Sequence, residues 1–174
     1  MENSISINIP PLVHVLAVLL TGLIAGLFYG YDCSVVTGLG KLNNETYLQA
    51  FQSINKVILR PYFFISFMGS LAVLPVAGWL SYTRGSSTAF YLLLFATIIY
   101  TVAVVGVTLF CNVPLNEQLS KFNVTAATQN EIAGMRALFE KPWNRYHTIR
   151  TVAAAFAFVL TILSLLKGKQ LYEI

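Results

Sequence analysis

Charged side chains are scarce in this sequence, and their scarcity decides the class of protein. Only 10% of the 174 residues are Asp, Glu, Lys or Arg, whereas a soluble domain carries about a quarter. Hydrophobic residues make up 56% of the chain, and its mean hydropathy is +0.68. Because so few charges cannot cover a surface that faces water, the sequence predicts an integral membrane protein.

Cysteine and histidine are nearly absent too. Two cysteines, Cys33 and Cys111, exclude a disulfide-rich scaffold and a four-cysteine metal site, and whether they pair is left open. The only histidines, His14 and His147, are expected at opposite faces of a hydrocarbon core of about 30 Å, so they cannot share a metal ion or a haem within one chain. A site made of His147 and a cysteine is an alternative, but its spacing matches no known ligand pattern. No metal site is therefore predicted.

Signatures of several other functions are missing as well. The chain has 11 Lys and Arg against 7 acids, but they lie between apolar runs without interleaved aromatic residues, so nucleic acid is not an expected partner. There is no phosphate-binding glycine loop, no Ser-His-Asp pattern and no helical zinc motif. The N-terminus lacks a basic region and a cleavage site, so the first apolar run is expected to be retained.

Four apolar runs have the length of about 20 residues that a spanning helix needs. They cover residues 12–31, 61–82, 88–110 and 148–166. We therefore predict an all-α fold in which residues 1–174 form a single domain, an integral membrane four-helix bundle. Pro75 is expected to kink the second span, because proline removes a backbone donor and clashes with the preceding turn. Gly22, Gly26 and Gly30 form a stripe that favours close packing within the bundle, with homodimerisation or a close-fitting ligand as alternatives.

Two long connections, residues 32–60 and 111–147, are expected on the same membrane face, opposite to both termini. Each is predicted to contain a short amphipathic helix. The first carries Gln49, Gln52 and Lys56 at helical spacing and leads into the second span. The second covers residues 131–141 and is expected to end before Pro142.

Two asparagines flank a proline in the segment FCNVPLNEQL, which follows the third run. Pro114 is expected to break the helix, and Asn112 then either caps a new helix that begins near Pro114 or faces a polar pocket. Asn116 needs a separate explanation, since one cap uses one residue.

The segment WNRYHTIRT leads into the fourth span. Trp143, His147 and Arg150 follow one another at spacings of four and three residues, so they share one helical face. Arg150 lies about one turn inside the span. It either extends to the lipid head groups or faces the bundle, where Asp32 or Glu117 is the expected carboxylate partner.

All four spans thus bring polar residues to the same membrane face. Packing or capping accounts for each residue alone, but their convergence favours a functional pocket. In this pocket His147 and Arg150 are the predicted catalytic residues. The predicted ligand-binding residues are Asp32, Asn55, Arg60, Asn112, Asn116 and Trp143.

These polar residues in apolar surroundings resemble the anthrone oxygenase-like family, a largely uncharacterised group of four-span membrane proteins. The resemblance extends from Gly22 to about Leu163. It is carried by the polar residue Asn55 ahead of the second span, by the NxPxN segment of residues 112–116 and by the W-x-x-x-H-x-x-R-T segment of residues 143–151.

The resemblance implies a chemistry. Fungal members named anthrone oxygenases convert a ring methylene of polyketide anthrones to a carbonyl with dioxygen. For this chain the resemblance implies that His147 acts as the base and that Arg150 and the asparagine amides stabilise an enolate oxygen. The implied reaction requires no cofactor, because an electron-rich enolate passes an electron to dioxygen itself. If the protein has another function, its cofactor is unknown.

Two classes of function stay open. The first is an oxygenase acting on a lipophilic phenol, quinol or anthrone-like molecule, and the second is a non-catalytic lipid- or quinone-binding subunit of a larger membrane complex. A transporter is disfavoured, because only one broken helix is predicted where repeats would occur in pairs. A catalyst should hold a cavity lined by His147 and Arg150, whereas a packing subunit should pair these two side chains with each other. Membrane lipids and a lipophilic small molecule are the expected partners, and a homo-oligomer is left open.

The orientation in the membrane is harder to predict. Eight of the Lys and Arg residues lie on the face of the long connections and three on the other, and basic residues accumulate on the cytoplasmic side. Two glycosylation-type sequons, at Asn44 and Asn123, lie on the same face and favour the opposite orientation. We expect a multi-pass protein of a bacterial inner membrane with its long connections in the cytoplasm.

Overall fold

The computed structural model describes residues 9–167, which contain helices and no strand. Four helical runs in this part of the chain are long and apolar enough to cross a membrane: Pro11–Gly40, Pro61–Thr83, Ser87–Lys121 and Gln129–Lys167. The predicted all-α, four-span membrane architecture is therefore confirmed.

Several helical elements join end to end to build these runs. The first run consists of α1 (Ile9–Gly30), the π-helical segment η1 (Tyr31–Val36) and α2 (Thr37–Gly40). A separate helix, α3 (Asn44–Val57), precedes the second run, α4 (Pro61–Thr83). The third run joins α5 (Ser87–Ile99), the π-helical segments η2 (Tyr100–Gly106) and η3 (Thr108–Asn112), and α6 (Val113–Lys121). The fourth is one helix, α7 (Gln129–Lys167).

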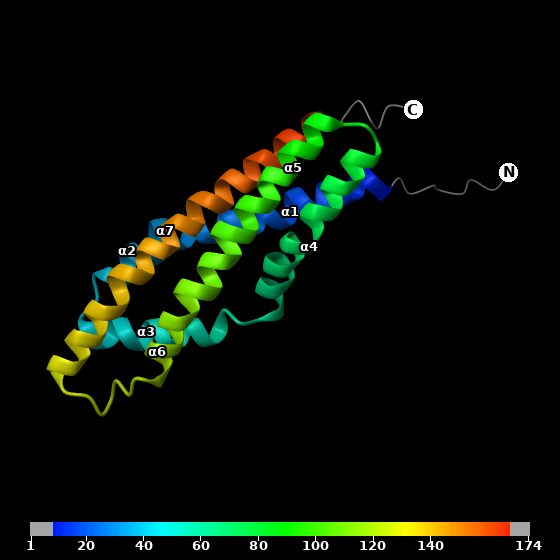
Figure 1. Cartoon of the computed structure of the whole chain (residues 1–174). Helices are drawn as coiled ribbons and strands as arrows, with labels where there is room; N and C mark the ends of the chain where they lie inside the picture. The colour runs from blue at the N-terminus through cyan, green and yellow to red at the C-terminus, as the bar shows by residue number, and fades with distance from the viewer. Residues whose placement is uncertain (1–8, 168–174) are drawn as a thin grey trace.

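The four runs lie side by side as an elongated bundle, and α3 crosses one end of it next to α6 (Figure 1). A tight turn joins α4 and α5 at the opposite end, where α1 begins and α7 ends. Gly85 in this turn has a φ of 77°, a conformation that residues with a Cβ rarely adopt. Both long connections thus emerge at the α3 end, as the alternation of four spans requires.

The four runs differ in length. At 1.5 Å per residue, the 23 residues of α4 rise about 34 Å, close to the thickness of the hydrocarbon core. The 39 residues of α7 rise about 58 Å. α4 begins at Pro61, and the other three runs extend beyond its first turn at the α3 end (Figure 1).

Two predicted helix ends are wrong. Pro114 does not break the third run: Asn112 and Val113 both keep right-handed helical dihedral angles, and Asn112 makes no capping hydrogen bond with its side chain. The π-helical segment η3 ends directly before Val113, and its wider turn accommodates the proline ring. Pro142 likewise lies inside α7 instead of ending a short helix before it.

The amphipathic helix predicted in the first connection is confirmed as α3. Asn43 caps it, since its Oδ1 accepts a hydrogen bond from the backbone nitrogen of Thr46 at 2.8 Å. Tyr47, Leu48 and Phe51 form its buried face, and they pack with α6 and α7 in an apolar cluster separate from the cluster inside the bundle.

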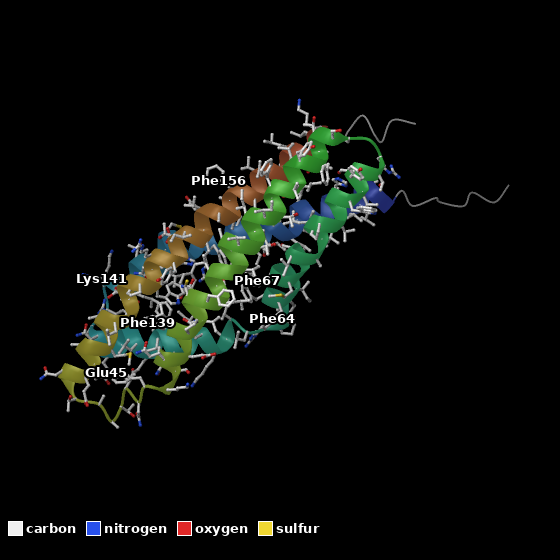
Figure 2. The ribbon with its side chains drawn as sticks, in the orientation of Figure 1. Glu45, Phe64, Phe67, Phe139, Lys141 and Phe156 are labelled. Atoms are coloured by element: carbon white, nitrogen blue, oxygen red, sulfur yellow. The ribbon has the colours of Figure 1, made fainter. Side chains whose placement is uncertain are left out.

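The apolar cluster inside the bundle follows the inner faces of the spans. Phe67 points inward between α4 and α5, whereas Phe156 points away from the bundle (Figure 2). Of the glycine stripe on α1, only Gly22 lies against another helix: a Cβ there would be 2.9 Å from Phe158 of α7. Nothing lies within 4 Å of such an atom at Gly26 or Gly30. Close packing within the bundle therefore accounts for Gly22 alone.

Arg136 of α7 fixes the segment that precedes α3. Its guanidinium donates hydrogen bonds to the carbonyl oxygens of Gly40 (3.0 Å) and Leu42 (2.7 Å) and to the Glu140 carboxylate (2.7 Å). Its Cζ also lies 4.3 Å from the centre of the Tyr47 ring. Burial, followed by the charge of Glu140, raises the pKa of Tyr47 above its ordinary value, while Arg136 lowers it. Arg136 therefore holds α3 in place over the end of the bundle.

We expect Arg136→Ala to destabilise the protein by about 2 kcal/mol or more, because hydrogen bonds to a charged group contribute about 1.5–3 kcal/mol and the two carbonyl oxygens lose their donor. The measurement is thermal unfolding of the purified protein in detergent. Arg145→Ala is the matched control, since Arg145 is an exposed arginine of the same helix. Equal melting temperatures of the two variants would contradict this role of Arg136.

Candidate functional site

A small cavity lies between the spans at the end of the bundle that α3 covers. Its volume is about 100 Å³, and we call it the inner cavity. It is lined by Leu27, Phe28, Tyr31, Ile54, Asn55, Ile58, Leu59, Phe63, Thr108, Val113, Asn116, Trp143, His147 and Arg150. Because Phe63 belongs to the first turn of α4, the inner cavity lies at the level where α4 begins. All four spans and α3 contribute to its wall.

Arg150 brings a positive charge into this cavity, although the side chain is only 8% exposed. Its Nε donates to Nδ1 of His147 at 3.1 Å, and its Nη1 donates to the Thr108 hydroxyl at 3.3 Å. Its Cζ lies 4.5 Å from the centre of the Phe28 ring. Within residues 9–167, the only Lys or Arg in an ion pair is Arg136. The carboxylate partner predicted for Arg150, Asp32 or Glu117, is therefore wrong.

His147 is held in one orientation by its neighbours. Its ring stacks on Trp143 with centroids 5.0 Å apart, and it meets Tyr31 edge-on at 5.2 Å. Since an arginine only donates, Nδ1 accepts the hydrogen bond from Arg150, and the proton of the neutral ring must then sit on Nε2. Nε2 is buried and makes no hydrogen bond, although the Phe28 carbonyl interacts with the ring. The Nε2–H group is thus a buried donor without a well-aligned acceptor among the described residues, and the Phe28 carbonyl oxygen is its neighbour.

This tautomer changes the role expected for His147. A base needs an unprotonated nitrogen that faces the substrate, and here the nitrogen without a proton is occupied by Arg150. In this arrangement neither ring nitrogen of His147 is both unprotonated and unoccupied.

The two asparagines around Pro114 both hold Trp143. Nε1 of Trp143 donates to Oδ1 of Asn116 at 2.8 Å, and Nδ2 of Asn112 donates to the Trp143 carbonyl oxygen at 3.2 Å. Asn112 is fully buried behind the cavity wall and does not line it. Both amides therefore fix the aromatic ring on which His147 stacks, and Asn116 also lines the cavity.

Asn55 reaches the cavity from α3. Its Nδ2 is buried and has no hydrogen-bond partner among the described residues. Nδ2 is a donor, like Nε2 of His147 and the guanidinium of Arg150. An unpaired buried donor costs about 1–3 kcal/mol, so these groups together favour a ligand that carries a hydrogen-bond acceptor.

The remaining predicted residues lie elsewhere. Asp32 and Arg60 do not line the inner cavity. Asp32 instead accepts a hydrogen bond from the Thr148 hydroxyl at 3.3 Å, and Arg60 is exposed directly before α4. Cys33 and Cys111 are free thiols.

Among the cavity residues that the sequence analysis did not name, Phe28, Tyr31 and Thr108 contact His147 or Arg150. Tyr31 begins η1 and Thr108 begins η3, and π-helical turns are frequent at functional sites. A signal for Thr108 was present, since it precedes Asn112 and Asn116 at four-residue steps. The assumed break at Pro114 concealed this stripe.

The two histidines are far apart, as predicted. His14 bonds to Ser81 near the end of α4 at 2.9 Å, whereas His147 packs against Phe28. Fourteen residues of α1 separate His14 from Phe28, a rise of about 21 Å. Within the described residues, no three His, Cys, Asp or Glu side chains converge as metal ligands.

We expected a catalyst to have a cavity lined by His147 and Arg150 and a packing subunit to pair these two side chains with each other. The structure shows both features. His147 and Arg150 line a cavity, and they also bond to each other. The bond uses Nδ1 of His147 and Nε of Arg150, and it leaves Nε2 without a side-chain partner among the described residues.

The chain was compared with known proteins. A family model described as anthrone oxygenase matches residues 63–160, more than half of the 174 residues. The chain belongs to the anthrone oxygenase family. No curated protein and no solved structure matched it.

The part matched to the anthrone oxygenase family holds most of the polar cavity wall. It includes Thr108, Asn116, Trp143, His147 and Arg150. It leaves out α1, η1 and α3, which contribute Phe28, Tyr31 and Asn55. The family match therefore covers the charged side of the cavity, and the side formed by α1, η1 and α3 lies outside it.

Proposed function

We propose that this protein is an oxygenase that binds a lipophilic phenol, quinol or anthrone-like molecule in the inner cavity and oxidises it with dioxygen. One observation carries the proposal: Arg150 holds a buried positive charge without a carboxylate partner among the described residues. Charged residues at membrane depth are costly, and they commonly mark functional sites. An anionic oxygen on a ligand would complete the coordination of Arg150.

The reaction follows from this anionic oxygen. An anthrone has a methylene next to two aromatic rings and opposite its carbonyl, so loss of one proton gives an enolate. The donors Arg150, His147 Nε2 and Asn55 Nδ2 stabilise the enolate oxygen and thereby make the substrate more acidic. The proton passes to water, because His147 is not placed as a base.

Dioxygen is the only oxidant that the reaction needs. The enolate gives one electron to dioxygen, the resulting radical and superoxide combine at the methylene carbon, and the peroxide formed loses water. Each methylene thus consumes one dioxygen, with one oxygen atom in the new carbonyl and the other in water. The protein contributes binding, orientation and charge stabilisation.

The test uses purified protein in nanodiscs, an anthrone and ¹⁸O-labelled dioxygen. We expect oxidation at least about tenfold faster than in protein-free nanodiscs, one dioxygen consumed per molecule and one labelled oxygen in the product. Protein-free nanodiscs are the necessary control, because anthrones also oxidise spontaneously. A rate equal to that control would refute the proposal.

Quinone binding without oxygenation is the second candidate, favoured by the hydrogen bond between Arg150 and His147. A quinone carbonyl would accept from the same donors. This function predicts saturable quinone binding with no dioxygen uptake from any enolisable substrate.

A further inference from the structure

A larger groove lies beside the inner cavity at the outer side of α3 and α6. Its volume is about 570 Å³, and we call it the outer groove. Five residues line both spaces: Asn55, Ile58, Leu59, Val113 and Asn116. The two spaces therefore adjoin each other across these residues.

The sizes of the two spaces limit how a ligand can bind. Pockets for drug-sized ligands measure about 300–1,000 Å³. The inner cavity, at about 100 Å³, is below this range, and the outer groove, at about 570 Å³, is within it. An aromatic ligand therefore fits only if its oxygen-bearing edge enters the inner cavity and its remaining part lies in the outer groove. Asn55, whose Nδ2 is buried and unpaired among the described residues, lies at the border that such a ligand would cross.

The outer groove is positively charged. Lys56 of α3 and Lys121 of α6 line it, with Glu117 as its one acidic residue. In the part of the chain that the structure describes, neither lysine forms an ion pair. An anion in the groove would therefore meet two lysines and one glutamate, with neither lysine held in an ion pair.

We propose that the outer groove binds the carboxylate end of an elongated aromatic ligand and that Lys56 and Lys121 select for it. The placement of the aromatic end of the ligand in the inner cavity rests on the proposed function. The preference of the outer groove for a carboxylate can be measured without any turnover. The substrate class is then an aromatic enol or phenol with a carboxylate at its distal end.

Tryptophan fluorescence gives a direct measure of binding. The chain contains two tryptophans; Trp143 lines the inner cavity, and Trp79 is 64% exposed on α4. Trp79→Phe therefore leaves Trp143 as the only reporter. The probes are anthraquinone and anthraquinone-2-carboxylate, titrated in nanodiscs of neutral phosphatidylcholine.

We expect the carboxylate to bind about fivefold tighter than the neutral quinone, as expected for contacts with exposed charges. Lys56→Gln and Lys121→Gln should each reduce this preference, and the double variant should abolish it without changing the Kd of the neutral quinone. Lys141→Gln is the control, because Lys141 is an exposed lysine on α7 at the same end of the bundle and does not line the groove (Figure 2).

The lysines could also bind the phosphate of an anionic lipid, and a second titration separates the two sources of negative charge. It repeats the experiment in nanodiscs that contain phosphatidylglycerol. An unchanged carboxylate preference supports the proposal, whereas its loss through competition by phosphatidylglycerol assigns the groove to lipid and overturns it.

Two outcomes of the neutral-lipid titration would also overturn the proposal: no quenching by either probe, or a preference that survives in the double variant. Turnover without lysine-dependent selectivity would refute this inference alone. Selectivity without turnover would refute the oxygenase alone.

Discussion

Arg150→Met should lower kcat/KM for anthrone oxidation by about 10²–10³-fold, the usual cost of removing one donor to a developing oxyanion. The substitution removes the buried positive charge near the predicted enolate oxygen but keeps much of the side-chain volume. Because replacing a buried charge by an apolar side chain is often neutral or stabilising, the melting temperature should stay close to that of the parent. The measurements are steady-state dioxygen uptake and thermal unfolding in the same detergent.

Two matched variants sharpen this prediction. Arg145→Gln removes an exposed arginine of the same helix and should leave kcat/KM unchanged. Arg150→Lys keeps the charge but loses the bond from Nε to His147, so an intermediate rate is expected. Full activity of Arg150→Met would show that its charge does not act on the substrate.

His147→Leu should lower kcat/KM by about 10²-fold or more, whereas His147→Gln should lose no more than about tenfold. Both side chains approximate the size of the imidazole, and this matters because alanine would leave a void beside Phe28, Tyr31 and Trp143. Glutamine can accept the bond from Arg150 with its amide oxygen and donate an N–H to the cavity. Leucine can do neither.

These two variants distinguish between two roles of His147, a hydrogen-bond donor and a general base. Glutamine cannot take a proton at neutral pH, so a base at position 147 would make both variants equally inactive. A base would also give the parent kcat/KM an acidic limb that vanishes in His147→Gln. If His147 is a donor, the pH profiles of the parent and His147→Gln should have the same shape.

The fold was largely predictable from the sequence. Four apolar runs and few charges suffice to predict four spans. In lipid the backbone N–H and C=O groups of each span must form their hydrogen bonds within that span, so each run becomes a helix independently of the others. The helix ends were less predictable, since tertiary packing decides whether a proline interrupts a helix. Phe139 and Trp143 pack on α3 on either side of Pro142, and the helix continues through it.

The candidate site was predictable in its position but not in its contacts. Asn55, Asn116, Trp143, His147 and Arg150 were named from the sequence, and all five line one cavity. The sequence could not indicate that Arg150 bonds to His147 and Thr108 instead of to an acid, because the rotation of one helix against another determines this pairing.

The position of Arg150 on α7 has a consequence for how the chain enters the membrane. α7 follows the other three spans in synthesis, and an arginine opposes insertion by about 2.5–3.5 kcal/mol at the centre of a span. Arg150 lies away from that centre, and the most apolar 18-residue window of this helix, with a mean hydropathy of 2.2, offsets the smaller penalty. The three earlier spans should therefore insert first, without the site. The positively charged site forms only when α7 packs against them, so assembly of the bundle and formation of the site are the same step.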